Sequence, residues 1–118
     1  MLTNFGKFVR KVRIDNGDLL KDMADVLQVT SSYLSAVEIG KRNVPITWAE
    51  TITKHYKLNK LQEAELYAAI DDSQLNIKID LSTYDTFEKN IVLTFARKFD
   101  TLADSDKEQI RTLLSKRK

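Results

Sequence analysis

Residues 30–43 hold side chains whose chemistry suits a polar, negatively charged partner. The segment is rich in hydroxyl groups and ends in two cations and an amide, and its candidate residues are Thr30, Ser31, Ser32, Tyr33, Lys41, Arg42 and Asn43. Hydroxyl groups donate or accept hydrogen bonds at base edges, and Lys and Arg neutralise phosphates. The first fourteen residues also contain Lys7, Arg10, Lys11 and Arg13 and no acid; such a basic cluster is compatible with a polyanionic partner and equally with a solvated helix face.

The same sequence supports no catalytic chemistry. The chain has no cysteine, and His55 is its one histidine, so we expect no metal site. The Ser31–Ser32 pair has no nearby histidine to act as a base, and no glycine-rich phosphate loop occurs. Asp71 and Asp72 fit the end of a helix better than a catalytic pair. We therefore expect that the protein is not an enzyme and uses no cofactor.

Composition and charge are those of an ordinary globular protein with a basic first half. The 118 residues are 42% hydrophobic and 31% charged, with a formal net charge of +2. Residues 1–59 contain nine Lys or Arg against six Asp or Glu, whereas residues 60–118 contain ten against eleven. No apolar run approaches the ~20 residues that cross a bilayer, and residues 1–10 lack the apolar core of a signal peptide. We expect no membrane partner and a cytoplasmic location.

Helical periodicity dominates the first part of the chain. An apolar stripe predicts a first helix that ends at Asn16–Gly17, and this stripe consists of Phe5, Phe8, Val9 and Val12. Asp18 is the expected N-cap of a second helix, whose buried residues are predicted to be Leu19, Leu20, Met23 and Leu27. Thr30 is the expected N-cap of a third helix, which Gly40 ends.

Two capping boxes predict two more helices. Thr47 and Glu50 begin the first, with Ile46 as a hydrophobic staple, and Asn59 and Gln62 begin the second. The expected buried residues are Trp48, Ile52, Tyr56, Leu61, Leu66, Ala69 and Ile70. The chain is therefore predicted to be all-α, with a five-helix domain at residues 1–72.

The remaining residues divide into a connecting segment and a helical tail. Residues 73–82 form a linker or a short extended segment, because residues 76–81 alternate apolar and polar side chains; a strand here would need a partner, such as a second subunit. Residues 83–118 predict a C-terminal αα-hairpin, with Ser82 or Thr83 capping its first helix and a box at Ser105–Glu108 beginning its second. The hairpin's aromatic-rich stripe includes Tyr84, Phe87, Ile91, Phe95 and Phe99.

So short a hairpin cannot bury enough apolar surface to be stable alone. Its stripe must therefore pack on the first domain, on a second copy of the chain, or on a different protein. These three alternatives stay open at this point.

Four apolar residues have the spacing of a helix-turn-helix. Such a motif needs a small residue where its two helices cross, an apolar residue in the turn, and two inward residues on the second helix. These positions are met by Ala24, Val29, Leu34 and Val37. The segment Met23–Arg42 closely resembles the lambda-repressor/Cro-like (XRE) helix-turn-helix family, and the resemblance covers residues 3–58. Gln28 departs from the family's usual glycine, and Leu20 departs from a frequent glutamine.

The resemblance implies roles for individual residues. Ser31, Ser32 and Ala36 would meet base edges of double-stranded DNA in the major groove, flanked by Thr30 and Tyr33. Lys41, Arg42 and Asn43 would follow the sugar–phosphate backbone, with Lys7 and Arg10 as further phosphate contacts from the first helix. Arg13 and Glu38 would form an ion pair within the domain.

The resemblance also implies a function. We expect a sequence-specific transcriptional regulator, acting as a homodimeric repressor on a pseudo-palindromic operator, with residues 73–118 providing dimerisation. One alternative is the antitoxin of a toxin–antitoxin pair, which would bind the toxin through its C-terminal part and regulate its own operon. Another is a tail that senses an antirepressor through the aromatic stripe.

Overall fold

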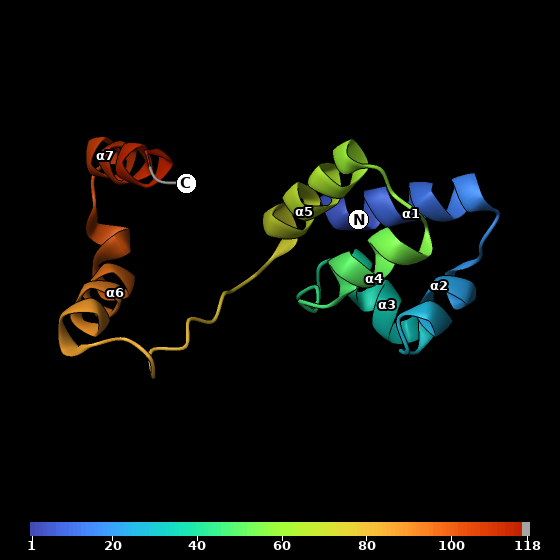
Figure 1. Ribbon diagram of the computed structural model, residues 1–118, viewed down its shortest axis with the longest axis horizontal. Helices are drawn as coiled ribbons and strands as arrows, with labels where there is room; N and C mark the ends of the chain where they lie inside the picture. The colour runs from blue at the N-terminus through green and yellow to red at the C-terminus, as the bar shows by residue number, and fades with distance from the viewer. Residues whose placement is uncertain (117–118) are drawn as a thin grey trace. The chain divides into compact units, whose positions relative to one another are not determined.

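The protein is all-α across the part of the chain that the structure describes. The structure is a computed structural model that describes residues 1–116, in which there are seven α-helices, one short 3₁₀ helix and no strand. The chain divides into two compact units, the first at Met1–Ile77 and the second beginning at Lys78 (Figure 1). Helices α1 to α5 belong to the first unit, and α6 and α7 belong to the second.

Helix α1 (Asn4–Asn16) has a defined cap at each end. The Thr3 hydroxyl accepts a hydrogen bond from the Gly6 N–H at 3.0 Å. Gly17 ends the helix in the left-handed conformation, with φ 69°, as the Asn16–Gly17 pair predicted. Glycine fits this position because it has no Cβ to oppose a positive φ.

Helix α2 (Leu20–Val26) does not use its predicted cap. The Leu19 N–H donates to the Asp22 carboxylate at 2.8 Å, whereas Asp18 accepts from the Tyr56 hydroxyl at 2.9 Å. Asp18 was wrongly predicted as the N-cap because its partner lies 38 residues away. Burial, and then the hydrogen bond to Asp18, raises the pKa of the Tyr56 phenol well above its usual range, so this hydroxyl remains a donor at neutral pH.

Helix α3 (Ser31–Glu38) begins as predicted. The Thr30 hydroxyl accepts from the Tyr33 N–H at 3.0 Å, and Gly40 follows the helix with φ 84°. The turn before α3 places Gln28 at φ 59°, so this residue adopts the left-handed conformation that glycine would adopt more easily. Leu34 and Val37 are fully buried, as expected.

Helices α4 (Trp48–His55) and α5 (Lys60–Ser73) complete the first unit. The Asn59–Gln62 box is present, with hydrogen bonds of 2.8 and 2.9 Å. The Thr47 box is not: Thr47 has helical dihedrals and makes no side-chain cap, because the Trp48 N–H already closes a turn onto the Pro45 carbonyl at 3.1 Å. The predicted staple residue, Ile46, is 95% exposed.

The core of the first unit draws on all five helices. Its largest fully buried side chains are Phe5, Val9, Met23, Leu34, Val37, Ile52 and Leu66. Helix α1 packs against α2, α3 and α5, and α4 packs against α5. Leu19 and Leu61, predicted to be buried, are exposed because they lie at or next to the first residue of their helices.

The first unit continues beyond the predicted boundary at residue 72. The Gln74 side chain accepts from the Val44 N–H at 2.9 Å and donates to the Val44 carbonyl at 3.1 Å. The Asn43 side chain accepts from the Leu75 N–H and donates to the Asn76 side chain, both at 2.7 Å. These contacts fix residues 74–76 to the first unit. Residues 76–81 have no strand assignment, so the strand alternative is not observed in them.

The second unit contains α6 (Thr86–Lys98), a 3₁₀ helix (Phe99–Thr101) and α7 (Asp104–Ser115). Asp85 caps α6 in a box with Glu88, rather than Ser82 or Thr83. At the start of α7, Asp106 accepts from the Ala103 N–H at 3.2 Å, so the predicted Ser105–Glu108 box is wrong. In the described residues, α6 and α7 are not packed along their lengths as a hairpin would be.

In residues 1–116, every helix is too short or too polar to cross a bilayer.

Helices α1 and α3 approach each other closely at Gly6. A Cβ added there would collide with the Glu38 carbonyl oxygen and come within 3.1 Å of the Leu2 side chain. We predict that Gly6→Ala lowers the free energy of unfolding by roughly 2 kcal/mol, because α1 and α3 must separate. Urea denaturation measures this change. Lys7→Ala, at an exposed site on the same helix, is the control and should change stability by less than about 0.5 kcal/mol. An equally small effect of Gly6→Ala would contradict the close approach.

Candidate nucleic-acid interface

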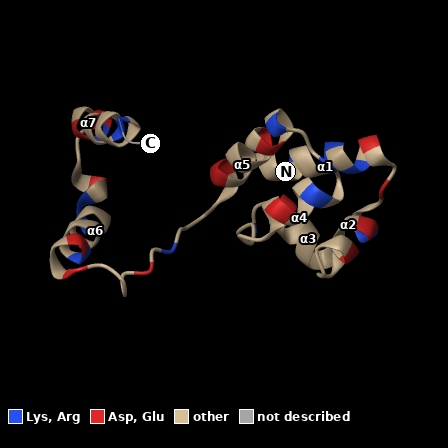
Figure 2. Cartoon of the chain, in the orientation of Figure 1, with Lys and Arg blue, Asp and Glu red and all other residues tan. Residues whose placement is uncertain are grey.

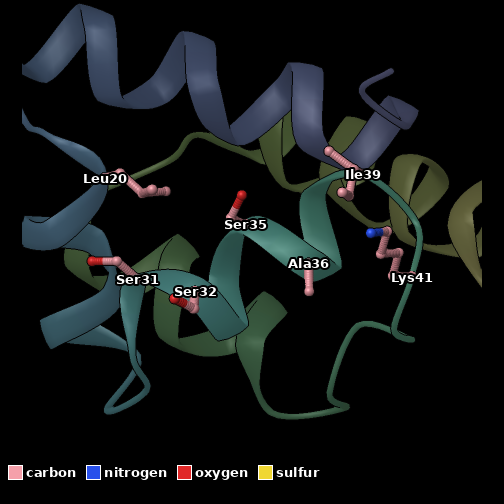
Figure 3. Close-up of a pocket in the computed structure, with 7 residues that line it drawn as sticks. All are labelled: Leu20, Ser31, Ser32, Ser35, Ala36, Ile39 and Lys41. Carbon is pink, nitrogen blue, oxygen red and sulfur yellow. The ribbon is translucent and has the colours of Figure 1, made fainter.

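The outward face of α3 borders an open depression. Leu34, Val37 and Glu38 are buried, and Tyr33 packs against the core from one side. The short side chains of α3 lie on its other side. The depression is lined by side chains from α2, α3 and the loop after α3, namely Leu20, Ser31, Ser32, Ser35, Ala36, Ile39 and Lys41 (Figure 3). Four residues predicted from the sequence therefore lie together here: Ser31, Ser32, Ala36 and Lys41.

Three residues of this depression were missed by the sequence analysis: Leu20, Ser35 and Ile39. Helical spacing could have revealed Ser35 and Ile39, because each lies one turn after the previous lining residue on the same face. Ile39 is 38% exposed, and Leu20 is half-buried. The depression thus combines serine hydroxyl groups with aliphatic side chains, which suits contact with a surface that presents both polar atoms and methyl groups.

Thr30 and Tyr33 contribute differently from the other predicted base-contacting residues. The Thr30 hydroxyl is engaged in capping α3. The Tyr33 ring packs edge-on against Trp48, with centroids 6.0 Å apart, and the Arg42 guanidinium carbon lies 4.8 Å from the Tyr33 ring centroid. This stack joins the loop after α3 to the core through an aromatic pair and a cation–π contact.

The two loop cations are exposed, but Asn43 is engaged. Lys41 and Arg42 are open to solvent, whereas α3 itself carries no Lys or Arg (Figure 2). The Asn43 side chain is bound to residues 75 and 76 through its oxygen and its nitrogen. In this state its amide is directed to the protein's own backbone, so Lys41 and Arg42 are the available groups for a phosphate.

The two candidate cations of α1 lie on different faces of that helix. Lys7 shares a groove between α1 and α5 with Asn4, Lys11 and Glu65. Arg10 lies one turn from both Gly6 and Arg13, each of which contacts Glu38 of α3. Arg10 is therefore on the side of α1 that borders α3, whereas Lys7 faces α5.

The ion pair expected between Arg13 and Glu38 is present and buried. Its two hydrogen bonds measure 2.7 and 3.1 Å, and the side chains are 9% and 5% exposed. Arg13 also lies 3.4 Å from the Met23 sulfur. A bidentate contact of this kind fixes orientation as well as distance. It therefore holds the C-terminal end of α3 against α1.

The backbone of Glu38 is fixed as well. Its carbonyl oxygen accepts hydrogen bonds from the Thr3 N–H and the Thr3 hydroxyl, both at 2.9 Å. Side chain and main chain of one residue thus anchor α3 at two points on and just before α1.

Comparisons with known proteins add no family to these observations. No family model matches the chain, and neither a curated protein nor a solved structure matches it. Among the described residues, no group of three or more His, Cys, Asp or Glu side chains is placed to hold a metal ion.

The buried ion pair leads to a prediction about stability. Arg13→Met should lower the free energy of unfolding by about 3–5 kcal/mol, because the Glu38 carboxylate is left buried without a partner. The double variant Arg13→Met/Glu38→Leu should recover much of that loss. Denaturant titration of the single and double variants measures this coupling.

The exposed pair of Lys11 and Asp15, 3.2 Å apart, is the matched control. Its Lys11→Met variant should cost no more than about 0.5 kcal/mol, since exposed pairs contribute little. If the stability loss of the double variant equals the sum of the losses of the two single variants, the coupling between Arg13 and Glu38 is contradicted.

Proposed function

We propose that the protein is a sequence-specific DNA-binding transcriptional regulator of the lambda-repressor/Cro-like type, acting as a homodimeric repressor. The observation that carries this proposal is the outward face of α3, where Ser31, Ser32 and Ala36 lie beside Lys41 around one open depression. In this proposal α3 is the recognition helix in the major groove. The five helices of the first unit are its lambda-repressor-like domain, and the protein works in the cytoplasm.

The residues of α3 suit a particular kind of base recognition. Serine hydroxyls discriminate weakly between bases, and the Ala36 methyl can contact the methyl group of thymine. Leu20 and Ile39 add aliphatic surface to the same depression. Since α3 has no Arg, Asn or Gln, bidentate contacts to guanine or adenine are not available from it. DNA shape and bridging water then supply part of the specificity.

Backbone contacts come from three cations in this proposal. Lys41 and Arg42 lie in the loop after α3, and Arg10 lies one turn from Gly6 and Arg13, which contact the end of α3. The contact of Arg42 with the Tyr33 ring, which itself packs against Trp48, favours a fixed position of this guanidinium before DNA arrives. Lys7 and Asn43 make no phosphate contact in this proposal, because Lys7 lies in the groove beside α5 and the Asn43 amide is bound to residues 75 and 76.

An antitoxin function is the second candidate. It is favoured by the exposed apolar side chains of the second unit, among them Phe87 and Ile91, which would bind the toxin. Co-purification with the product of a neighbouring gene would separate it from the first candidate. In both cases the first unit binds operator DNA.

Selection from random double-stranded DNA tests the proposal. The full chain should enrich an inverted repeat with half-sites about one helical turn apart. Gel-shift titration of the enriched site against a scrambled site then measures specificity. A chain that enriches no sequence, or binds both sites equally, would contradict the proposal.

Ser32→Arg should change the preferred sequence. An arginine at this position of α3 can make a bidentate contact to guanine, so the selected half-site should gain a guanine. Repeating the selection with the variant measures this change. Ser105→Arg, in α7, adds the same charge and should leave the selected sequence as it was. A shift in both variants would point to charge alone.

Lys41→Ala and Arg42→Ala should weaken binding to all sequences alike. Each lost phosphate contact should reduce the slope of log K against log salt by about one unit. Gel-shift titrations over a series of salt concentrations measure this slope. Lys60→Ala, at an exposed position at the start of α5, is the control. Slopes equal to that of the parent would remove these two residues from the interface.

A further inference from the structure

The second unit leaves its apolar side chains uncovered. No side chain is buried among residues 78–116. The stripe along α6 and the 3₁₀ helix consists of Phe87, Ile91, Phe95 and Phe99, which are 74%, 52%, 44% and 40% exposed. A chain segment this short does not form a stable core alone, so this face requires a covering partner.

Two opposite charges lie on the same face as this stripe. At about 100° per residue, Glu88 and Lys98 fall within the arc that the four apolar residues occupy. Both side chains are exposed, and Glu88 lies near the start of α6 whereas Lys98 is its last residue. One carboxylate oxygen of Glu88 accepts from the Asp85 N–H at 3.1 Å, which leaves the other oxygen available. The face thus has an acidic beginning, an apolar middle and a basic end.

This order is self-complementary in one orientation. Phe87 and Phe99, Glu88 and Lys98, and Ile91 and Phe95 are each equally far from position 93 in the sequence. When two copies of α6 run antiparallel and meet at that position, Ile91 of each lies level with Phe95 of the other. Glu88 of each then lies level with Lys98 of the other.

We infer that the face of α6 bearing Phe87, Glu88, Ile91, Phe95 and Lys98 pairs antiparallel with the same face of a second copy of this chain. A two-fold pair of this kind buries one patch against itself. Its centre is apolar, and each end carries a Glu88–Lys98 contact. In a parallel pair the same layers would hold Glu88 against Glu88 and Lys98 against Lys98, and both contacts would be repulsive.

The aromatic contacts already present involve the C-terminal half of this face and leave its N-terminal half the more exposed. The Phe95 and Phe99 rings lie 5.3 Å apart, and the Lys107 ammonium lies 4.8 Å from the Phe99 ring centroid. Phe99 is thus partly covered within its own unit, whereas Phe87 and Ile91 have the larger exposed fractions. The second copy supplies the missing cover to these residues.

The inference rests on the homodimer of the proposed function and adds its geometry. Because the association is measured on the full chain without DNA, its failure leaves operator binding by the first unit as a separate question. Conversely, a protein that enriches no DNA sequence can still form this dimer.

The first test reverses the charges of Glu88 and Lys98 at the two ends of the face. The parent should be dimeric at micromolar concentration in sedimentation equilibrium at low salt. Lys98→Glu should raise the dimer Kd by about tenfold, because two attractive contacts become repulsive. The double variant Glu88→Lys/Lys98→Glu restores opposite charges and should restore most of the affinity.

Arg97→Glu is the matched control, because it makes the same charge change in the same turn but on a different face. It should leave the dimer Kd within about twofold of the parent. A monomeric parent, or a Lys98→Glu variant that associates as the parent does, would overturn the inference and leave the face to the first unit or to a different protein.

Disulfide cross-linking is the second test, and it reads orientation directly. The chain has no cysteine, so an introduced thiol is the only one present. An equimolar mixture of Glu88→Cys and Lys98→Cys proteins should form the mixed disulfide on mild oxidation, whereas neither protein alone should cross-link efficiently. In the antiparallel pair the two Glu88 positions are about 15 Å apart along the helix axis. Cross-linking of each protein with itself but not in the mixture would overturn the antiparallel pairing.

Discussion

The buried ion pair of Arg13 and Glu38 is the contact on which the placement of α3 depends. Glu38 is the last residue of α3, and both its carboxylate and its carbonyl are bound, to Arg13 and to Thr3 respectively. A buried pair adds little net stability over a well-packed apolar pair, but it penalises any arrangement in which the charges separate. The pair therefore specifies one position of α3 against α1. Gly6 makes that position accessible, because any larger side chain would hold the two helices apart.

With its end fixed, α3 needs little else to present its outer face. Its beginning is held by the Thr30 cap and its inner side by Leu34 and Val37. The side chains that remain outside are short, and few rotamers are open to serine and alanine. Preorganisation of this surface thus comes from the backbone of α3, whereas the longer Arg42 side chain is positioned by its contact with Tyr33.

Local signals account for what the sequence predicted correctly. The Thr30 cap, the Asn59–Gln62 box and the left-handed Gly17 each involve residues within one turn of each other. The Arg13–Glu38 pair, 25 residues apart, was reached through the resemblance and not through any local pattern.

Two of the wrongly predicted helix caps share a physical cause, which is competition from another hydrogen bond. Asp18 accepts a hydrogen bond from the Tyr56 hydroxyl, 38 residues away, instead of capping α2. Thr47 failed as a cap because the turn closed by Trp48 gives it helical dihedrals. The helical spacing of its apolar residues predicted the stripe of α6, but this spacing does not determine which surface covers the stripe.

The contact between Asn43 and residues 75–76 also has a mechanical meaning. Residues 75 and 76, which lead to the second unit, are hydrogen-bonded to Asn43 in the loop that carries Lys41 and Arg42. A force applied to residues 78–81 is therefore resisted first by the hydrogen bonds of Gln74 and Asn43, before it acts on the helical core. Residues 75 and 76 and the loop with Lys41 and Arg42 are joined through Asn43, so a force applied to the second unit is transmitted to a point beside the depression at α3.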